Sequence, residues 1–352
     1  MRMIQCDMHM VWSAIADLAL LLMTVTILSI IFSVVSIRAW ADEAGELRVV
    51  LPEGNKGIAS KYPGDIGIEG DSKVIFVEKF DEGSLDAVFK RWDSPHGKEI
   101  MTLSPDVPQH SVDDTSLMLT HIGGEGTGGH LYRRLLPGHK RVFARFYVKF
   151  NPDCAPIHHF GTHLGGFNPP TPWPQGGAGT RPDGDKRFTT GVEPFGSKWQ
   201  WDFYTYWQGM HVHGGGQYWG TPFLTGENKP EVERGKWICV EMMVKVNDQV
   251  DDSNGEQAFW IDGKLYRRDG QVISHIGKGF PNGRWTGGWW QPDSKSAETF
   301  EGFQWRSVEE LAVNYVWTYL YITKAPDGHV SKVWFDNIVI ATDYIGPIQP
   351  QQ

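Results

Sequence analysis

The sequence predicts an all-β protein built as two antiparallel sheets packed face to face. Its composition is rich in rings and turn formers, with 16 Trp, 41 Gly and 21 Pro among 352 residues. No segment keeps the 3.6-residue period of an amphipathic helix, and no helical patterns alternate with the strand-like runs. Many short strands of this kind are typical of a two-sheet sandwich. We see no internal repeat and no low-complexity linker, so one large core is expected.

From Val74 onwards, strand-like runs are separated by turn signals. In Arg141–Phe150 the side chains alternate, and one face is wholly apolar, which predicts the face toward the core. The runs are VIFVEKF, SLMLTHI, GHLYRRLL, VFARFYVKF, KWQWDFYTYW, KWICVEMMVKV, AFWIDGKLY, NYVWTYLYIT and KVWFDNIVIA. The opposite faces of several runs are too aromatic for an idle solvated surface.

The N-terminus carries a targeting signal. The apolar stretch Leu18–Ser36 is followed by Ala39-Trp40-Ala41, a small-x-small triplet of the kind that signal peptidase cleaves. The stretch is also long enough to remain as an uncleaved membrane anchor. Either reading exports the folded part, so we expect a secreted, periplasmic or cell-surface protein. The expected organisation is a leader at 1–41, an irregular lead-in at 42–73, a sandwich domain at 74–345 and a tail at 346–352.

Charge and cysteine content exclude several classes of function. The formal net charge is −9, and no run of Lys and Arg offers a phosphate-binding footprint, so nucleic acid is not an expected partner. We expect contact with a membrane only through an uncleaved leader. We also expect the protein to be a monomer. Without the leader two cysteines remain, Cys154 and Cys239, which form either one disulfide or two buried thiols. No zinc-type Cys/His pattern is present.

Three long loops, at 164–186, 209–233 and 277–298, interrupt the strands. Each contains Trp or Tyr among Gly and Pro. Long irregular segments in a compact domain are often functional. Loops of this composition suit the walls of a groove for an extracellular polysaccharide.

Several segments resemble a known family of folds. VIFVEKFDEGS, GKWICVEMMVKVND, NGEQAFWIDGKLY and VWFDNIVIATDYIGPI resemble strands of the concanavalin A-like lectin/glucanase sandwiches. The middle, HHFGTHLGGFNPPTPWPQGGAGTRPDGDKRFTTGVEP with WQWDFYTYWQGM, resembles polysaccharide lyase family 14 more particularly. The resemblance covers about Val74 to Ile345. It implies a jelly-roll sandwich that cleaves, or only binds, a uronate-containing glycan.

The resemblance directs attention to residues suited to β-elimination. That reaction needs a group to neutralise the uronate carboxylate, a base for the C5 proton and an acid for the leaving oxygen. The candidates are Arg145, Lys149 and Gln200 at the carboxylate, His159 or His163 as base, and Tyr204 or Tyr206 as acid. Structural roles for the same residues stay open, as does a lectin-like protein without catalysis. No ExDxxE strand is present, which argues against a retaining glucanase.

Two further sets of residues complete the expected site. Aromatic side chains pack against pyranose rings, so outward-facing residues of the strands are candidates for substrate binding. These candidates are Tyr147, Trp237, Glu241, Tyr315, Trp317 and Tyr319. No cofactor is required for elimination. Asp81 and Asp336 resemble the calcium pairing between terminal strands in such sandwiches, which implies a structural calcium ion.

Signal peptidase is expected to release a chain that begins near Asp42. N-terminal sequencing of the protein expressed in a secreting host would check this. A full-length chain retained in the membrane fraction would instead identify Leu18–Ser36 as an anchor.

Overall fold

A computed structural model describes residues 50–224, 229–293, 295–296 and 298–351. Pro52–Gln352 form one compact unit. The expected leader, with its cleavage site, lies outside the described residues. Within the described part of the chain, no helix is long and apolar enough to span a membrane.

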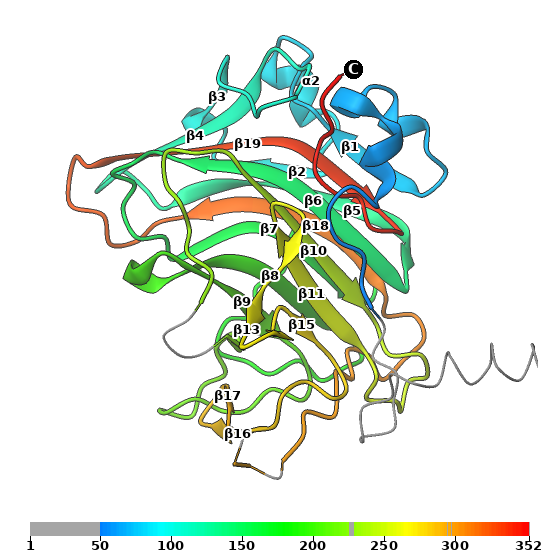
Figure 1. Cartoon of the computed structure of the whole chain (residues 1–352). Helices are drawn as coiled ribbons and strands as arrows, with labels where there is room; N and C mark the ends of the chain where they lie inside the picture. Colours follow the sequence, from blue (N-terminus) through cyan, green and yellow to red (C-terminus); the bar gives the residue numbers. More distant parts are fainter. Residues whose placement is uncertain (1–49, 225–228, 294, 297, 352) are drawn as a thin grey trace, which may run out of the picture. The chain divides into compact units, whose positions relative to one another are not determined.

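The described residues form two large antiparallel sheets, which confirms the predicted sandwich (Figure 1). In the larger sheet the order is β12-β11-β10-β6-β19-β4-β3, with β1 paired to β19 and β15 to β11. The bounds of its strands are β1 (Val74–Glu78), β3 (Met101–Ser104), β4 (Ser116–Ile122), β6 (Arg141–Phe150), β10 (Ile238–Lys245), β11 (Glu256–Ile261), β12 (Lys264–Leu265), β15 (His275–Ile276) and β19 (Val330–Ala341).

The smaller sheet has the order β2-β5-β18-β7-β8-β9. Its strands are β2 (Ser94–His96), β5 (Gly128–His139), β7 (His159–Phe167), β8 (Arg187–Phe195), β9 (Gln200–Tyr206) and β18 (Val313–Tyr321). Two small hairpins are β13 (Arg267–Arg268) with β14 (Gln271–Val272), and β16 (Gly283–Thr286) with β17 (Trp289–Pro292). The helical turns are η1 (Ile58–Lys61), η2 (Pro63–Asp65), η3 (Ile68–Gly70), α2 (Leu85–Phe89), η4 (Lys98–Ile100) and η5 (Gly196–Lys198).

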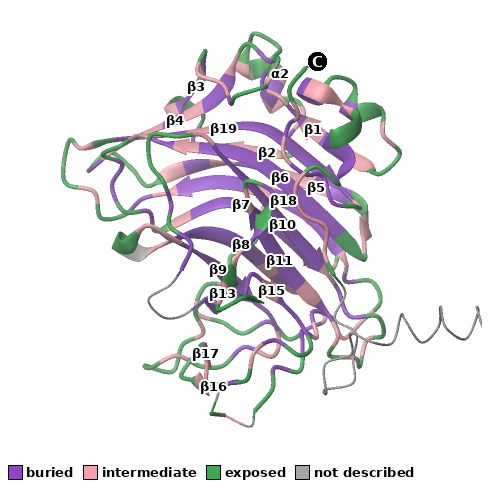
Figure 2. Ribbon diagram, viewed as in Figure 1, coloured by how far each residue is buried: buried purple, intermediate pink, exposed green. Residues whose placement is uncertain are grey.

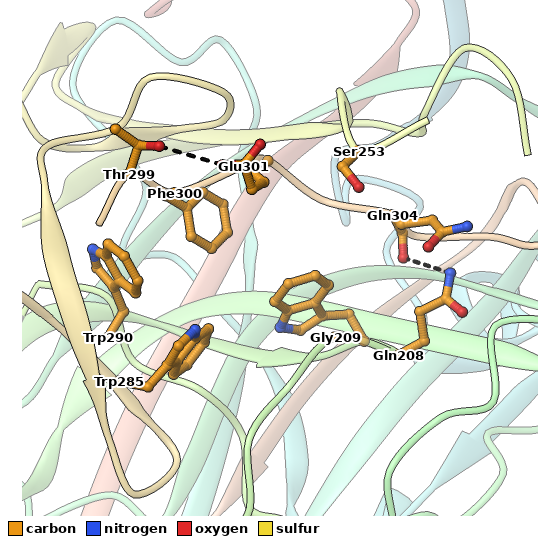
Figure 3. A pocket seen from close by; sticks show the side chains of 11 residues that line it. Gln208, Gly209, Ser253, Trp285, Trp290, Thr299, Phe300, Glu301 and Gln304 are labelled. Carbon is orange, nitrogen blue, oxygen red and sulfur yellow. Dashed lines mark hydrogen bonds between the residues drawn. The ribbon is translucent and has the colours of Figure 1, made fainter. Parts of the chain in front are cut away.

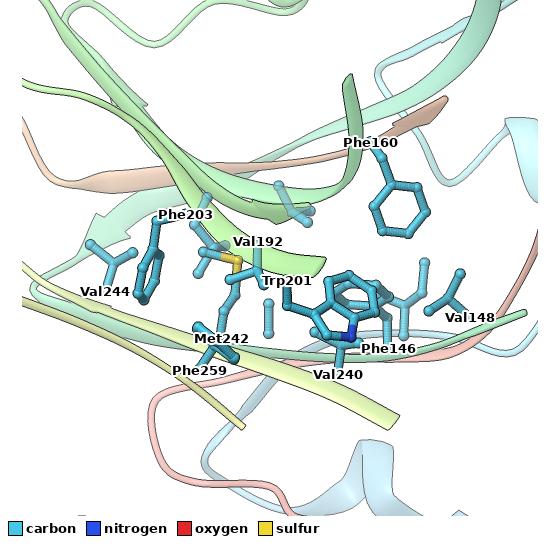
Figure 4. Packing of buried hydrophobic residues seen from close by; sticks show 14 of the residues in the cluster. Phe146, Val148, Phe160, Val192, Trp201, Phe203, Val240, Met242, Val244 and Phe259 are labelled. Carbon is cyan, nitrogen blue, oxygen red and sulfur yellow. The ribbon is translucent and has the colours of Figure 1, made fainter. Parts of the chain in front are cut away.

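The core lies between the two sheets, where alternate residues of each strand meet. Trp201 and Phe203 of β9 pack there with Phe146 of β6 and Val240 and Met242 of β10 (Figure 4). Figure 2 shows the strands mainly buried, with the exposed residues mostly in the connecting loops. Burial of each large apolar side chain contributes about 1.5–3 kcal/mol, so this layer is the main source of stability.

All nine predicted runs form strands in this arrangement. The sequence analysis missed β7 and β8, whose sequences are HFGTHLGGF and RFTTGVEPF. Glycine is depleted in strands, so these two segments give a weak strand signal. Together they form the middle of the smaller sheet, between β18 and β9.

The outer face of the larger sheet is covered by the two ends of the folded unit. Arg145 of β6 is fully buried and forms an ion pair with Asp65 of η2. The Glu241 carboxylate of β10 accepts hydrogen bonds from the backbone N–H groups of Ile345 and Gly346, at 2.7 and 2.8 Å. The lead-in (blue) and the C-terminal segment (red) lie side by side over this sheet (Figure 1), joined by a 2.8 Å bond from Gly64 N to Gln349 O.

These contacts correct the expected roles of five residues. Arg145 and Glu241 hold the terminal segments, and the Tyr147 hydroxyl accepts a 2.9 Å hydrogen bond from the Ile348 N–H. The Lys149 ammonium and the Trp237 indole both bind the Asp106 carboxylate, at 2.5 and 2.8 Å. Four of these residues lie in β6 or β10 of the larger sheet, and Trp237 directly precedes β10. Their polar groups already bind other parts of the protein.

Cys154 and Cys239 are both buried and free. Of the two alternatives for these residues, the structure favours two unpaired thiols. Burial raises the pKa of the Cys154 thiol to about 12, so this thiol stays protonated at neutral pH.

Replacing Arg145 by Leu is expected to reduce the free energy of unfolding by about 3–5 kcal/mol, because Asp65 would be left buried without its partner. Urea denaturation measures this change. The matched control is Arg134→Ala, which breaks the half-exposed pair with Asp93 and should cost at most about 1 kcal/mol. Arg145→Met combined with Asp65→Asn should recover much of the loss. Equal effects of Arg145→Leu and Arg134→Ala would contradict the structural role of the buried pair.

Candidate functional site

A groove of about 390 Å³ lies on the outer face of the smaller sheet. Its floor comes from β5, β7, β8, β9 and β18, and the loop at 175–178 forms one wall. The side chains that supply its polar and aromatic surface are His96, His130, His159, His163, Gln175, Arg187, Thr189, Tyr204, Tyr206, Trp317, Tyr319 and Tyr321.

Strand alternation places these residues together. In β8 the residues Arg187, Thr189, Gly191 and Glu193 alternate with Phe188, Thr190 and Val192, which face away from the groove. The register with β9 sets Thr189 opposite Tyr206 and Gly191 opposite Tyr204. On the other side, β18 sets Trp317 opposite His163 and Tyr321 opposite His159.

His159 is held by a buried carboxylate. Its Nδ1 lies 3.3 Å from Oε1 of Glu193, whose Oε2 accepts a 3.0 Å hydrogen bond from the Phe160 N–H. Because a carboxylate only accepts, Nδ1 donates its proton to Glu193, and in the neutral ring Nε2 is then the acceptor. The His159 ring lies 4.5 Å from the ring of Tyr204 between centroids. A histidine with this hydrogen-bonding pattern can act as a base at Nε2.

Tyr204, Tyr206 and Arg187 continue the row from His159. The two tyrosine hydroxyls are 3.2 Å apart, and the guanidinium of Arg187 lies 5.9 Å from the ring centroid of Tyr206. Burial raises the pKa of the Tyr204 hydroxyl well above its usual value, so this hydroxyl keeps its proton at neutral pH. The row thus offers an acceptor, a protonated hydroxyl and a cation along one side of the groove.

The loop at 175–180 holds Arg187 in place. Nη2 of Arg187 donates to the Gly177 carbonyl at 3.2 Å and to the carbonyl and hydroxyl of Thr180, both at 2.8 Å. The loop lies close over the guanidinium at Gly177, since a Cβ there would lie 2.3 Å from Nη1 of Arg187. Burial lowers the pKa of the guanidinium, but an arginine remains charged in proteins.

His163 lies deeper than His159. Its ring covers Gly191, where an added Cβ would lie 1.8 Å from Cδ2, and its Nε2 lies 3.3 Å from the Tyr319 hydroxyl. Burial lowers the pKa of His163 to about 3, so the imidazole is neutral at neutral pH. We assign it to positioning Tyr319 and the floor of the groove.

An aromatic platform continues the groove on the side of β18. Trp317 and Tyr319 are stacked, with ring centroids 4.4 Å apart and 19° between their planes. His130 meets Trp317 edge to face at 5.6 Å and lies 5.3 Å from His96. Such ring faces can pack against the apolar faces of pyranose rings.

The structure brings together part of the expected site. His159, His163, Tyr204, Tyr206, Trp317 and Tyr319 line the groove. Arg145, Lys149, Tyr147, Trp237 and Glu241 do not, because they lie on the larger sheet.

Gln200 and Tyr315 belong to the smaller sheet but do not line the groove. Gln200 opens β9 and pairs with Phe195 and Glu231. Tyr315 is buried, stacks on Phe167 at 4.9 Å and donates a 3.4 Å hydrogen bond to the Phe188 carbonyl. Packing against its neighbours, rather than glycan binding, accounts for Tyr315.

One oxygen of each expected calcium residue accepts a backbone hydrogen bond, while Oδ2 of Asp336 is buried without a hydrogen-bond partner among the residues that the structure describes. Asp81 accepts a 2.8 Å hydrogen bond from the Asp114 N–H, and Asp336 accepts one of 2.8 Å from the Asn337 N–H. Burial raises the pKa of Asp336 well above its usual range. In the described part of the chain, no group of three or more His, Cys, Asp or Glu is arranged to hold a metal ion. The calcium site therefore stays a prediction.

The sequence analysis missed Arg187 and Glu193. Both lie in RFTTGVEPF, which was not recognised as a strand. A signal was present, since Arg187, Thr189 and Glu193 alternate with apolar residues at a period of two. Gln175 and His130 also line the groove. Gln175 lies in a loop and gives no period-two signal, whereas His130 lies in the recognised run GHLYRRLL but was not identified as a site residue.

Comparison with known proteins yields structural likeness only. No family model matches the chain, and no curated protein matches its sequence. The alginate lyase vAL-1 from Chlorella virus is 12% identical, with 77% of this chain and 100% of that chain covered and a TM-score of 0.49. The endo-β-1,4-glucuronan lyase from the fungus Trichoderma reesei is 16% identical, with 79% of this chain and 99% of that chain covered and a TM-score of 0.40.

A third solved structure belongs to a different class of enzyme. The catalytic domain of the glycoside hydrolase family 131 protein from Coprinopsis cinerea is 13% identical, with 80% of this chain and 98% of that chain covered and a TM-score of 0.33. Each of the three scores lies below 0.5, so none of these likenesses assigns chemistry to the groove.

Acid is expected to destabilise the fold through His163. Its pKa is about 3 in the folded protein and about 6.5 in the unfolded chain, so the unfolded chain binds the proton first as the pH falls. The stability contributed by the neutral ring is complete above pH ~6.5 and decreases by about 3 kcal/mol between pH ~6.5 and ~4.

His163→Phe keeps a ring and removes the titration, so its free energy of unfolding should fall less steeply over this pH range. Denaturant titrations at several pH values measure the two slopes. His110→Asn, at an exposed histidine, should keep the wild-type slope. Identical slopes for the wild type and His163→Phe would contradict the buried neutral imidazole.

Proposed function

We propose that the groove cleaves a uronate-containing polysaccharide by β-elimination. The observation that carries the proposal is the continuous row His159–Tyr204–Tyr206–Arg187. The ring centroids of His159 and Tyr204 are 4.5 Å apart, and the hydroxyls of Tyr204 and Tyr206 are 3.2 Å apart. The guanidinium of Arg187 lies 5.9 Å from the ring centroid of Tyr206. The row contains the three kinds of group that elimination needs, all lining one groove. No other type of side chain is needed for the chemical step.

Arg187 neutralises the uronate carboxylate. Its Nη2 binds the loop at 177–180. The side chain lines the groove, so its other N–H groups are the ones that we expect to contact the carboxylate. Charge-assisted hydrogen bonds from a guanidinium are strong, especially where water is partly excluded. Gln175 lines the same wall and supplies an amide beside it. Stabilising the carboxylate in this way makes the neighbouring C5–H more acidic.

His159 and Tyr204 carry the proton transfers. Nε2 of His159 removes the C5 proton, and the electrons of the C5–H bond form the C4–C5 double bond. As the C4–O bond breaks, the leaving oxygen takes the proton of the Tyr204 hydroxyl. The imidazolium of His159 then returns a proton to Tyr204, whose ring is adjacent. Glu193 stabilises the imidazolium between these steps, since its carboxylate faces Nδ1.

A second candidate function is glycan binding without cleavage. The stacked pair Trp317–Tyr319 favours it, because an aromatic platform is sufficient to hold a sugar chain. Binding alone does not account for the Glu193–His159 contact or for the protonated Tyr204 beside it. We therefore prefer the lyase.

The remaining features of the proposal come from the sequence. Export by the N-terminal signal would bring the protein to an extracellular polysaccharide, and it would act there as a monomer. The reaction as written requires no cofactor. A relationship to polysaccharide lyase family 14 is part of the proposal and rests on the segments quoted above.

Tyr204→Phe is expected to lower turnover about a hundredfold or more and to leave substrate binding almost unchanged, as for the loss of a general acid. The assay follows the ultraviolet absorbance of the unsaturated uronate ends formed from glucuronan or alginate. Tyr62→Phe is the matched control, because its hydroxyl contacts Asp71 in the lead-in, away from the groove. Turnover by Tyr204→Phe equal to that of Tyr62→Phe would contradict the role of the acid.

Arg187→Ala should weaken both binding and turnover in the same assay, because the carboxylate loses its counter-charge in the ground state and the transition state. If the wild-type protein binds these polymers but forms no unsaturated ends, the lyase is wrong and the binding protein remains.

A further inference from the structure

A second pocket lies among the loops after β9 and β10, the β16–β17 hairpin and the segment that follows this hairpin. It has a volume of about 340 Å³, within the range of small-ligand sites, and its lining includes Trp207, Gln208, Trp285, Trp290, Glu301 and Gln304. We call it the loop pocket. Figure 3 shows the indoles of Trp285 and Trp290 on one side and the amides of Gln208 and Gln304 on the other.

The aromatic side of the loop pocket is rigidly packed. Trp290 meets Trp285 at 5.6 Å and Phe300 at 5.6 Å, both edge to face. His211 stacks on one face of Trp285 at 4.1 Å with 9° between the planes, so the pocket can meet only the opposite face or the edges of that ring. A half-buried indole fixed in this way provides a flat surface suited to a pyranose ring.

Hydrogen bonds hold the polar side chains on the other side of the loop pocket. The Gln208 amide donates to the Gln304 carbonyl at 3.0 Å, and the Gln304 amide donates to the Val250 carbonyl at 2.6 Å. These bonds use the Nε2 atoms and orient the two side chains, whose amide oxygens are acceptors of the kind that sugar hydroxyls bind. Glu301 accepts a 3.3 Å hydrogen bond from Thr299 and is the one charged side chain among the lining residues.

We propose that the loop pocket binds an uncharged pyranose unit of a glycan. The aromatic wall takes the apolar face of the ring, and Gln208, Gln304 and Glu301 accept from its hydroxyls. The Glu301 carboxylate would repel a uronate, which distinguishes this site from the Arg187 side of the groove. The site is argued from its own residues and does not depend on the proposed elimination.

A series of contacts leads from the groove toward the loop pocket. Gly220 packs on Tyr204, since a Cβ there would lie 2.5 Å from the Tyr204 ring. The adjacent Trp219 is 40% exposed, and its carbonyl lies 3.1 Å from Nε2 of His213. The His213 ring is 6.2 Å from Trp289, which is 39% exposed and precedes Trp290. A long glycan with both uronate and neutral units could follow this surface from one site to the other.

The test is an NMR titration of the whole protein with neutral hexasaccharides of glucose, mannose and xylose, and separately with hexaglucuronate. The indole N–H signals of Trp285 and Trp317 are assigned from Trp285→Ala and Trp317→Phe. At least one neutral sugar should shift the Trp285 signal and leave the Trp317 signal in place. Hexaglucuronate should not shift the Trp285 signal, whatever it does in the groove.

Calorimetry with the same sugars gives the affinities. Trp285→Ala should weaken neutral-sugar binding about tenfold or more, whereas Trp173→Ala, which removes an exposed tryptophan outside both sites, should not. Ser253→Trp provides a second test, because Ser253 is an exposed lining residue and a bulky side chain there fills the pocket without removing core contacts.

Binding of no neutral sugar in the panel would overturn the proposal. So would a neutral sugar that shifts only Trp317, or hexaglucuronate binding that Trp285→Ala and Ser253→Trp weaken. Loss of elimination in the groove would leave these outcomes unchanged, so the two proposals can fail separately.

Discussion

The buried ion pair between Arg145 and Asp65 ties the lead-in segment to the larger sheet, and the rest of the arrangement depends on that closure. Glu241 holds the C-terminal segment on the same face through two backbone N–H groups. Burying a charged or polar group costs free energy unless that group has a partner. Arg145 and Glu241 are therefore needed by their own partners and are not free to bind a substrate. The proposed elimination is therefore assigned to the smaller sheet, whose outer face carries the groove.

Three glycines in and beside the smaller sheet leave space for the side chains on its outer face. Gly191 leaves the space that the His163 ring fills, Gly165 leaves room for the Tyr315 hydroxyl, and Gly177 lets the loop close over Arg187. Side chains at these positions would displace the rings or the guanidinium. The two pockets differ in charge, since Arg187 lines the groove and Glu301 lines the loop pocket. The two sites would accordingly prefer different sugar units of one polymer.

The runs that were recognised as strands were those in which β-branched and aromatic residues alternate with polar ones. In β6 the sequence RVFARFYVKF identified the core face correctly, because Val142, Phe146 and Val148 are all buried between the sheets. The same pattern misled on function. Arg145 and Tyr147 face away from that core, as expected, but the sequence carries no sign that the chain ends return to cover them.

The sequence by itself determined the all-β class, the nine recognised strands and the aromatic residues of β9 and β18, because period-two alternation is a local property. Only the tertiary structure decided which outward face remains open. That outcome depends on contacts between residues far apart in the chain, such as Arg145 with Asp65 and His159 with Glu193. The tertiary structure also places Arg187 in the groove, since the pairing of β8 between β7 and β9 decides on which open face its alternate side chains lie.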